Sequence, residues 1–350
     1  MTTKDKKVFV ALSGGVDSSV TAALLCEQGY DCSGLFMITS EDSETSQISA
    51  QGIAKKLGLK LYTLDLRTEF EQILDYLCDE YRHGRTPNPC VLCNKKIKFG
   101  RLWSFANSKG ADFLATGHYA RILKYDGRFG LYAAADSSKD QSYALAMIDR
   151  DILPYVLLPM GQYSKKDVRK MAYRIGLQDI ISEDSQEICF LGGKDYTSVL
   201  ERKYPEYTHR GNVIDSRGVV LGQHNGIYNF TIGQRRGLGI AMGEPYYVSE
   251  IEPDTNTVTL GPKEEVMHKR FIAKDINWLG TEPNEPFQAT VKIRYNDNGS
   301  AAIVYPQGSS VEVEFDAPTL AITPGQLAVF YIRQGINNRV IAGAWIDKVI

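Results

Sequence analysis

Residues 7–18 read KVFVALSGGVDS, and this stretch decides the fold class of the chain. Residues 7–12 are an apolar run typical of a buried strand, and residues 18–29 follow a helical pattern that ends at a glycine. Two consecutive glycines between them allow a sharp turn that brings backbone N–H groups against an oxyanion. The helix dipole and the hydroxyls of Ser13 and Ser18 favour the same ligand. The stretch therefore predicts a phosphate-binding loop at the start of an α/β domain.

This loop differs from two common nucleotide-binding loops. The chain contains neither G-x-x-x-x-G-K-[ST] nor G-x-G-x-x-G, which excludes a Walker loop and the usual dinucleotide fingerprint. A carboxylate in a phosphate cradle, here Asp17, makes sense if a divalent cation such as Mg²⁺ bridges it to the phosphate. The alternative is a serine- and glycine-rich turn that only caps a helix. The complete pattern between a strand and a helix favours phosphate binding.

Apolar runs alternate with helical patterns over the first two-thirds of the chain, which predicts βαβ units and a parallel sheet. The expected strands are 7–12, 32–38, 59–66 and 112–116, and the expected helices are 18–29, 48–57 and 69–81. After about residue 205, turn signals crowd between β-rich runs typical of antiparallel strands. We expect an α/β nucleotide-binding domain over 1–205, a small central β-rich domain over 206–269 and an antiparallel β-barrel over 270–350.

The composition excludes several classes of protein. The 350 residues are 43% hydrophobic and 23% charged, which excludes a fully disordered chain. The net charge of −2 disfavours a nucleic-acid coat protein, although it allows an enzyme with a local basic patch. No apolar run approaches the ~18 residues of a membrane helix, and residues 1–7 lack a secretory signal. Six scattered cysteines indicate a reducing compartment, so we expect a cytoplasmic protein without a membrane partner.

Three cysteines lie in segments that suggest chemistry. Cys90 and Cys93 form a C-x-x-C pair in a proline-stiffened loop before a basic helix. We expect Asn94 to cap that helix and to leave Cys93 just outside its N-terminus, among ammonium groups that lower the pKa of a thiol. Cys189 lies among polar turn residues and glycines.

Other interpretations of these cysteines stay open. Cys90, Cys93 and Cys189 could hold an iron–sulfur cluster with one open iron site, or supply three ligands of a zinc site. No second C-x-x-C completes the zinc site. The remaining thiols are interpreted as buried and inert: Cys26, Cys32 and Cys78.

The loop SGGVDS resembles the pyrophosphate loop of the N-type ATP pyrophosphatases, which cleave ATP to AMP and pyrophosphate. A longer series of motifs occurs in one order from residue 13 to residue 331: SGGVDS, GRTPNPCVLCNKKIKFG, ATGHYAR, SKDQSYAL, DSQEICFLG, TIGQRRGLGI, KIRY and TPGQLAVFY. Together these motifs resemble the tRNA-specific 2-thiouridylases over nearly the whole chain. Two features depart from that pattern, because Cys90 replaces an acidic residue of some relatives and the loop over 36–47 is short.

The resemblance implies a chemistry and a set of sites. ATP would adenylate the C2 oxygen of the wobble uridine (position 34) of tRNA. A partner sulfur-relay protein would load a persulfide on Cys189. Cys93 would attack that persulfide as the nucleophile and leave a disulfide to be reduced. The implied ATP contacts are Ala11, Leu12, Ser13, Gly14, Gly15, Val16, Asp17, Ser18, Met37 and Gly117. The implied contacts to the target base are Asn88, Pro89 and Cys90, and those to tRNA are His118, Lys139, Asp140, Gln141, Arg294, Tyr295 and Gln326.

Several alternatives remain at this point. Residues 139–141 could be a solvated turn, and Arg235 and Arg236 could be either a solvated pair or a site for an RNA phosphate. An amide-forming synthetase would use the same phosphate loop, and an iron–sulfur-dependent tRNA thiolase would use the same cysteines. A non-catalytic RNA-binding protein with a vestigial nucleotide site is the alternative from another class.

Overall fold

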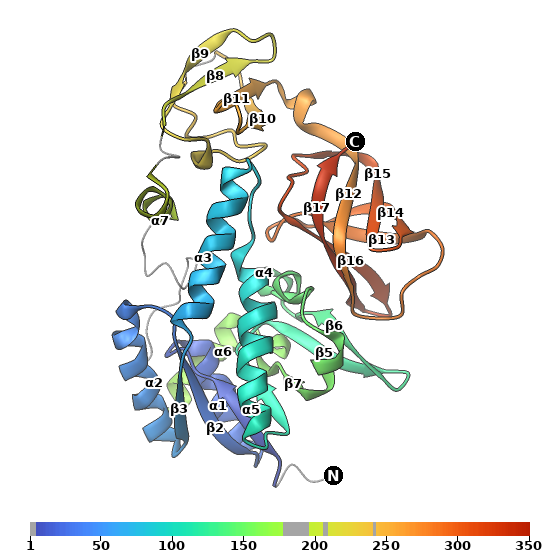
Figure 1. Cartoon of the computed structure of the whole chain (residues 1–350). Coiled ribbons are helices and arrows are strands. Elements are labelled where there is room, and N and C mark those ends of the chain that lie inside the picture. The colour runs from blue at the N-terminus through green and yellow to red at the C-terminus, as the bar shows by residue number, and fades with distance from the viewer. Residues whose placement is uncertain (1–4, 178–195, 206–208, 241–242) are drawn as a thin grey trace.

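The computed structural model describes residues 5–177, 196–205, 209–240 and 243–350, which contain three sheets (Figure 1). The first is a parallel sheet in the N-terminal part, the second a small sheet in the central part, and the third the sheet of a C-terminal barrel. The expected fold class is confirmed, while the domain limits at 205 and 269 stay predictions.

The parallel sheet has the strand order β3-β2-β1-β4-β7. Its strands are β1 (Lys7–Ala11), β2 (Asp31–Ile38), β3 (Lys60–Asp65), β4 (Phe113–Ala115) and β7 (Val156–Leu157), and all of their pairings are parallel. The chain adds β2 on one side of β1 and β4 on the other. The strand order therefore reverses at β1, and in open α/β sheets ligands bind in the crevice beyond the carboxyl ends of the strands at such a point.

Helices cover both faces of this sheet. The helices packed on it include α1 (Val16–Glu27), α2 (Glu44–Leu57) and α3 (Arg67–Arg82), and α6 (Lys165–Arg174) packs on the outside of α1. Val8 and Val10 pack with α1 and α2, whereas Phe9 packs with α3 on the opposite face. Strands buried on both faces read as continuous apolar runs, which is why residues 7–12 show no polar alternation.

The helix after the C-x-x-C pair begins earlier than we expected. α4 (Pro89–Cys93), a π-helical segment (Asn94–Leu102) and α5 (Trp103–Ser108) follow one another without a break. Asn88 is the N-cap, with its Oδ1 accepting from Val91 N at 3.4 Å, and Pro89 occupies the first helical position that proline favours. Asn94 has helical angles, φ −59° and ψ −50°, so its predicted role as N-cap is wrong.

The third sheet closes into the predicted antiparallel barrel. Its strands are β12 (Met267–Trp278), β13 (Phe287–Lys292), β14 (Ser300–Gln307), β15 (Ser310–Leu320), β16 (Leu327–Gln334) and β17 (Asn337–Val349), and β12 pairs with both β15 and β17. A hairpin from the N-terminal part, β5 (Ala120–Tyr125) and β6 (Arg128–Ala133), extends this sheet through β17. The turn of this hairpin is Asp126-Gly127, and both residues have the positive φ that a two-residue hairpin turn requires.

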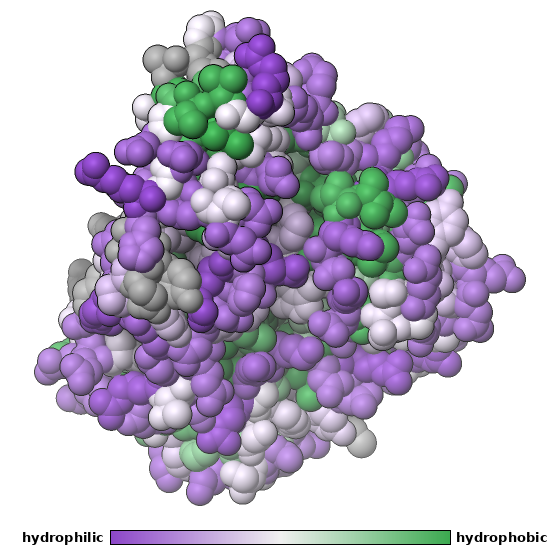
Figure 2. Space-filling model, turned by 45° about the horizontal axis from the view of Figure 1, so that its top comes forward, coloured by the Kyte–Doolittle hydropathy of each residue, from purple (hydrophilic) through white to green (hydrophobic). Residues whose placement is uncertain are grey.

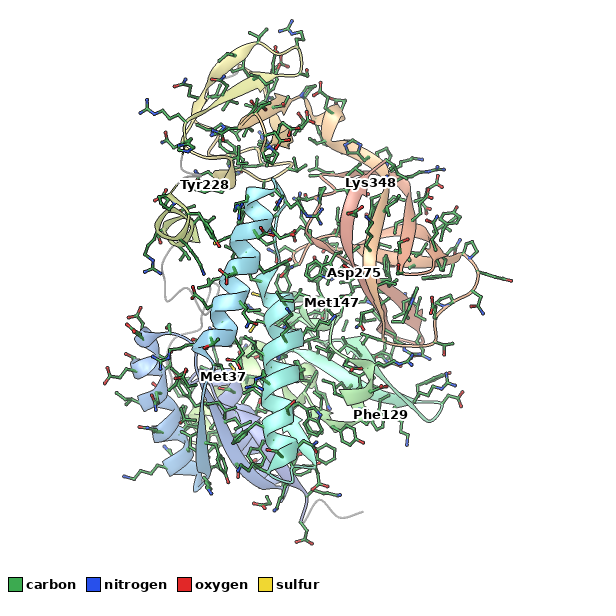
Figure 3. All side chains as sticks on the ribbon, viewed as in Figure 1. Met37, Phe129, Met147, Tyr228, Asp275 and Lys348 are labelled. Carbon is green, nitrogen blue, oxygen red and sulfur yellow. The ribbon has the colours of Figure 1, made fainter. Side chains whose placement is uncertain are left out.

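The N-terminal part and the barrel share a buried junction. Met147, labelled in Figure 3, is 1% exposed and lies between them. The Nδ2 of Asn277, on β12, donates to the carbonyl oxygens of Ala146 and Ile148 at 2.9 and 2.8 Å. The barrel is therefore fixed to the segment that follows β6.

The central sheet is small. Its strands are β8 (Gly211–Asp215), β9 (Val220–His224), β10 (Tyr247–Glu252) and β11 (Thr257–Gly261). Helix α7 (Tyr196–Lys203) precedes it, and Lys203 makes ion pairs with Glu71 and Asp75 of α3. Short 3-10 helices also occur among the described residues: Glu41–Ser43, Ser137–Lys139, Ser142–Leu145, Arg150–Tyr155, Pro159–Gln162, Ile227–Asn229 and Lys263–Val266.

The surface carries no continuous apolar belt on the face drawn in Figure 2, which is mostly hydrophilic with separate apolar patches. Among the residues that the structure describes, no helix combines the length and the apolar character needed to cross a membrane.

Candidate active site

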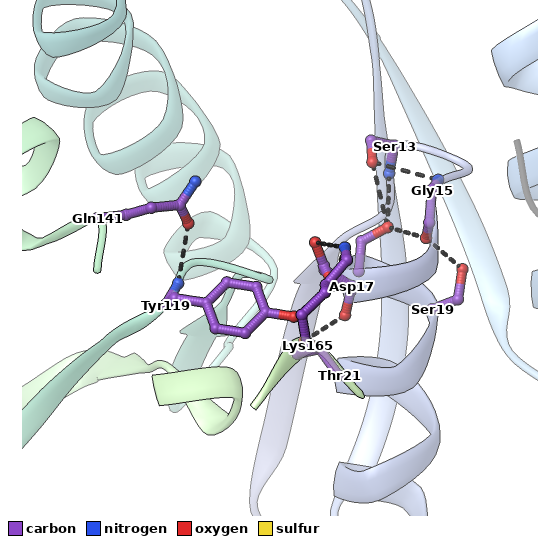
Figure 4. A network of polar contacts seen from close by, with 9 residues as sticks. Ser13, Gly15, Asp17, Ser19, Thr21, Tyr119, Gln141 and Lys165 are labelled. Carbon is purple, nitrogen blue, oxygen red and sulfur yellow. Dashed lines mark hydrogen bonds and ion pairs between the residues drawn. The ribbon is translucent and has the colours of Figure 1, made fainter. Parts of the chain in front are cut away.

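The predicted phosphate loop lies at the carboxyl end of β1, and its own hydroxyl groups hold it in shape (Figure 4). Ser18 Oγ donates to Gly15 O at 3.0 Å and accepts from Ser13 N at 3.2 Å. Gly14 has φ +84°, and a Cβ there would lie 2.9 Å from the carbonyl oxygen of Ser46 on α2, so only glycine fits. The loop is thus a preformed turn between β1 and α1.

Four other residues that the resemblance implies as ATP contacts lie in this loop, next to it or near it in the sheet: Ala11, Leu12, Val16 and Met37. Leu12 and Val16 are 2% and 8% exposed and belong to two separate hydrophobic clusters. Ala11 ends β1, and Met37 lies near the carboxyl end of β2, partly buried against the core (Figure 3).

Gly117 brings the segment after β4 against the phosphate loop. A Cβ at Gly117 would lie 2.9 Å from both Asp17 C and Ser18 N, in the first turn of α1. The resemblance implies an ATP contact at Gly117, and the close approach that the structure describes is to the backbone of α1. The segments after β1 and β4 therefore meet where the strand order reverses.

Two side chains that the sequence did not single out converge on Asp17 (Figure 4). Tyr119 OH donates to Asp17 Oδ1 at 2.7 Å, and Lys165 Nζ lies 2.9 and 2.8 Å from its two carboxylate oxygens. The side chains of Lys165 and Asp17 are 14% and 29% exposed, so this ion pair is partly shielded from water. The carboxylate expected to meet Mg²⁺ is thus held by a lysine and a tyrosine.

His118 lies beside this network and contacts Lys98 and Thr116. Lys98 Nζ approaches His118 Nε2 at 3.4 Å, and the Nδ1 lies 2.8 Å from Thr116 Oγ1. An ammonium group can only donate, so Nε2 accepts and the Nδ1–H donates to Thr116. Burial and the Lys98 charge lower the pKa of His118 well below its ordinary value of 6.5. His118 is neutral at pH 7.

We expect acidification to destabilise the chain partly through His118. The unfolded chain binds a proton at His118 below about pH 6.5, whereas the folded chain does not, so the free energy of unfolding falls as the pH falls. His118→Gln is expected to reduce this slope by up to about 1.4 kcal/mol per pH unit below about pH 6. Urea unfolding at several pH values measures it. His224, whose pKa is also lowered by burial, contributes equally to both proteins, so identical slopes would contradict the expectation.

The segment 139–141 is not the solvated turn that we held open as an alternative. The Asp140 carboxylate accepts from Ala134 N at 2.9 Å, Ser142 N at 3.1 Å and Ser142 Oγ at 2.8 Å. Gln141 Oε1 accepts from Tyr119 N at 2.9 Å, and Gln141 N donates to Tyr119 O at 2.7 Å. Gln141 thus braces the backbone of Tyr119 and Asp140 holds Ala134 and Ser142, whereas Lys139 is exposed.

The two cysteines of the C-x-x-C pair differ in environment. Cys90 lies exposed in the first turn of α4, and Cys93 is 2% exposed at the end of that helix. The effect of the helix dipole is confined to the first turn. Cys93 lies beyond that turn, inside the helix, so our placement of Cys93 outside the helix N-terminus is wrong.

Residues of the barrel hold the loop that leads to Cys90. Gln326 Nε2 donates to the carbonyl oxygens of Thr86 and Pro87 at 3.1 and 3.2 Å. Tyr295 is 44% exposed, and its pKa is raised by burial of part of the ring and by Asp140 and Cys90. Tyr295 is therefore an aromatic ring near Cys90.

Arg294 has an internal role. Its Nη2 donates to the carbonyl oxygens of Ile232 and Ala321 at 3.0 and 2.8 Å, and burial lowers its pKa. These bonds tie the segment that begins near Ile232, in the central part, to the barrel. Arg235 and Arg236, in the same segment, are exposed.

The zinc and iron–sulfur interpretations of the cysteines depend on a cluster of metal-ligating side chains. Across the described ranges, no group of three or more His, Cys, Asp or Glu side chains could hold a metal ion. Cys189, on which the iron–sulfur and zinc interpretations both depend, lies in 178–195, outside the described residues.

Three family models match consecutive parts of the chain. A tRNA methyl transferase HUP domain matches residues 6–193, a tRNA methyl transferase PRC-barrel domain matches 197–262, and an aminomethyltransferase β-barrel domain matches 268–346. The tRNA-specific 2-thiouridylase MnmA of Carboxydothermus hydrogenoformans is 44% identical over 98% of this chain and 98% of its own length. The chain belongs to the tRNA-specific 2-thiouridylase family.

A second member of this family, from Syntrophotalea carbinolica, is 43% identical over 99% of this chain and 100% of its own length. A solved structure of the U34-tRNA thiolase NcsA from Methanococcus maripaludis with its [4Fe-4S] cluster is more distant. It is 18% identical and covers 58% of this chain and 68% of that chain with a TM-score of 0.38, which is too low to carry an argument about chemistry. The family membership confirms the resemblance drawn from the motifs.

Proposed function

We propose that this chain catalyses ATP-dependent 2-thiolation of the wobble uridine, position 34, of tRNA. The observation that carries the proposal is the meeting of the SGGVDS loop and the Gly117 segment where the strand order reverses, in a member of the 2-thiouridylase family. The names of the family models mention methyl transfer instead. A methyl donor already carries its leaving group and needs no pyrophosphate loop, so the loop favours thiolation.

In the proposed reaction the uridine C2 oxygen attacks the α-phosphorus of ATP, and pyrophosphate leaves. Sulfur then attacks C2, and the bond between C2 and the adenylated oxygen breaks. This oxygen leaves as part of AMP, which is a far better leaving group than oxide. The turn at Ser13–Ser18 suits the departing pyrophosphate, since it combines hydroxyls, glycine backbone and a helix N-terminus. Asp17 is the residue that would meet a Mg²⁺ bound with ATP.

Two cysteines would deliver the sulfur. Cys189, outside the described residues, would carry a persulfide loaded by a sulfur-relay protein. Attack of the Cys93 thiolate on the inner sulfur would release the terminal sulfur and leave a Cys93–Cys189 disulfide, which a reductant must reopen. Asn88, Pro89 and Cys90 would meet the target base.

The proposed tRNA contacts fall into two groups. Lys139, Tyr295, Arg235 and Arg236 are exposed, so they suit direct contact with RNA phosphates or bases. The others already make internal hydrogen bonds: His118, Asp140, Gln141, Arg294 and Gln326. This second group supports the binding surface by positioning its neighbours.

The decisive experiment combines the full chain with an unmodified tRNA transcript, ATP, Mg²⁺ and a persulfide donor. We expect one pyrophosphate and one AMP per 2-thiouridine formed, and no 2-thiouridine with Cys189→Ser. Thiolation by the Cys189→Ser variant would refute the sulfur-carrier role. Consumption of ammonia instead of sulfur would indicate an amide-forming synthetase, and tRNA binding without pyrophosphate release a non-catalytic protein. Iron analysis of anaerobically purified chain tests the cluster alternative.

A further inference from the structure

Lys165 is placed by the packing of α6 on α1. It is the first residue of α6, after the N-cap Ser164, whose Oγ accepts from Asp167 N at 3.2 Å. Val168 and Ala172 of α6 are buried in one cluster with Val20 of α1. This packing fixes the start of α6 opposite the phosphate loop, 148 positions along the chain from Asp17.

The ion pair between Lys165 and Asp17 offsets the repulsion between the Asp17 carboxylate and a polyphosphate bound in the loop. A carboxylate beside a polyphosphate is repelled unless a cation lies between or beside them. Lys165 Nζ, at 2.8 Å, supplies that cation, and Tyr119 OH contacts the same carboxylate (Figure 4). A lysine ammonium is a point charge on a flexible stem with three donors, so it can contact Asp17 and a phosphate oxygen at the same time.

We propose that Lys165 is a residue of the nucleotide site that binds the β- and γ-phosphates of ATP, while Asp17 turns toward the bound divalent cation. The inference rests on the proposed function, because it adds a residue to the same ATP site. Lys165 thereby selects a polyphosphate over AMP, which binds that site without β- and γ-phosphates.

The test compares ligands that differ only in their phosphates. The Kd of Mg²⁺–α,β-methylene-ATP, of pyrophosphate and of AMP is measured by calorimetry on the full chain and on Lys165→Met. We expect the variant to weaken the ATP analogue and pyrophosphate about 10- to 100-fold, the loss of one charge-assisted hydrogen bond, and AMP less than about 2-fold. Lys165→Arg, which restores the charge, is expected to recover the preference for the polyphosphate.

The neighbouring Lys166 provides the matched control. Lys166 is exposed in the same turn, so Lys166→Ala is expected to leave all three affinities unchanged. If Lys165→Met does not fold, Lys165→Gln is measured instead. Equal weakening of the ATP analogue and AMP would overturn the inference and leave Lys165 as a structural partner of Asp17. If the unchanged chain binds no ATP analogue, the proposed function itself fails.

Discussion

Replacing Cys93 by alanine is expected to lower 2-thiouridine formation at least about a thousand-fold, because the proposed reaction loses its nucleophile. The chain should remain folded. Cys93 is 2% exposed within a large hydrophobic cluster, so removing one sulfur atom leaves a small cavity that costs about 1 kcal/mol. Single-turnover thiolation followed by nucleoside mass spectrometry measures the rate, and pyrophosphate release measures the adenylation step separately.

A buried cysteine elsewhere supplies the control. Cys78 on α3 is 0% exposed, and burial raises the pKa of its thiol to about 11, so it is protonated at neutral pH. Cys78→Ala makes a comparable cavity and is expected to retain the thiolation rate within about 2-fold. Undiminished thiolation by Cys93→Ala, or an equal loss in both variants, would contradict the assignment of Cys93.

The order of the main elements could be predicted because burial dictates periodicity. The middle residues of β1, Val8 to Val10, are buried on both faces of the sheet, so the apolar run over 7–12 clearly indicates a strand. The stretch SEDSETS over 40–46 lies in the loop expected over 36–47, and it contains a 3-10 helix and the start of α2. There Ser40 N donates to Ser43 Oγ at 3.2 Å as part of a capping box. Polar residues that favour loops also favour helix caps, which is why composition alone misled us.

The same ambiguity explains the error at the C-x-x-C helix. Asn88 and Asn94 are both suitable N-caps by residue type, and the basic run after Asn94 favours Asn94 in the sequence. Pro89 decides between them, because proline fits the first position of a helix and its fixed φ starts the turn. The consequence for function is that the exposed Cys90 occupies the helix start.

Part of the site could not be found from local sequence. The phosphate loop and Gly117 stand out because glycine is needed for close approach. Lys165 has no such signal, since Lys166 beside it has the same residue type and only the packing of α6 selects one of them. Tyr119 likewise reaches Asp17 across 102 positions. Residues that act through long-range geometry are visible only once the fold is known.

Replacing Gly117 by alanine is expected to disrupt the crevice itself. The new Cβ would lie 2.9 Å from Asp17 C and Ser18 N, and neither backbone atom can rotate away. The segment after β4 and the start of α1 must therefore separate, which is expected to lower the free energy of unfolding by about 1–3 kcal/mol. Displacement of the phosphate loop should also lower pyrophosphate release by about 100-fold. Urea unfolding and a tRNA-dependent pyrophosphate assay measure the two effects.

The control for Gly117 is a glycine with open space around it. A Cβ at Gly243 would meet no atom within 4 Å, so Gly243→Ala is expected to change the free energy of unfolding by less than about 0.5 kcal/mol. Comparing the two variants separates the steric effect from the general effect of adding a methyl group to a glycine. If Gly117→Ala unfolds at the same urea concentration as Gly243→Ala and releases pyrophosphate at the same rate, the contact between Gly117 and α1 does not position the phosphate loop.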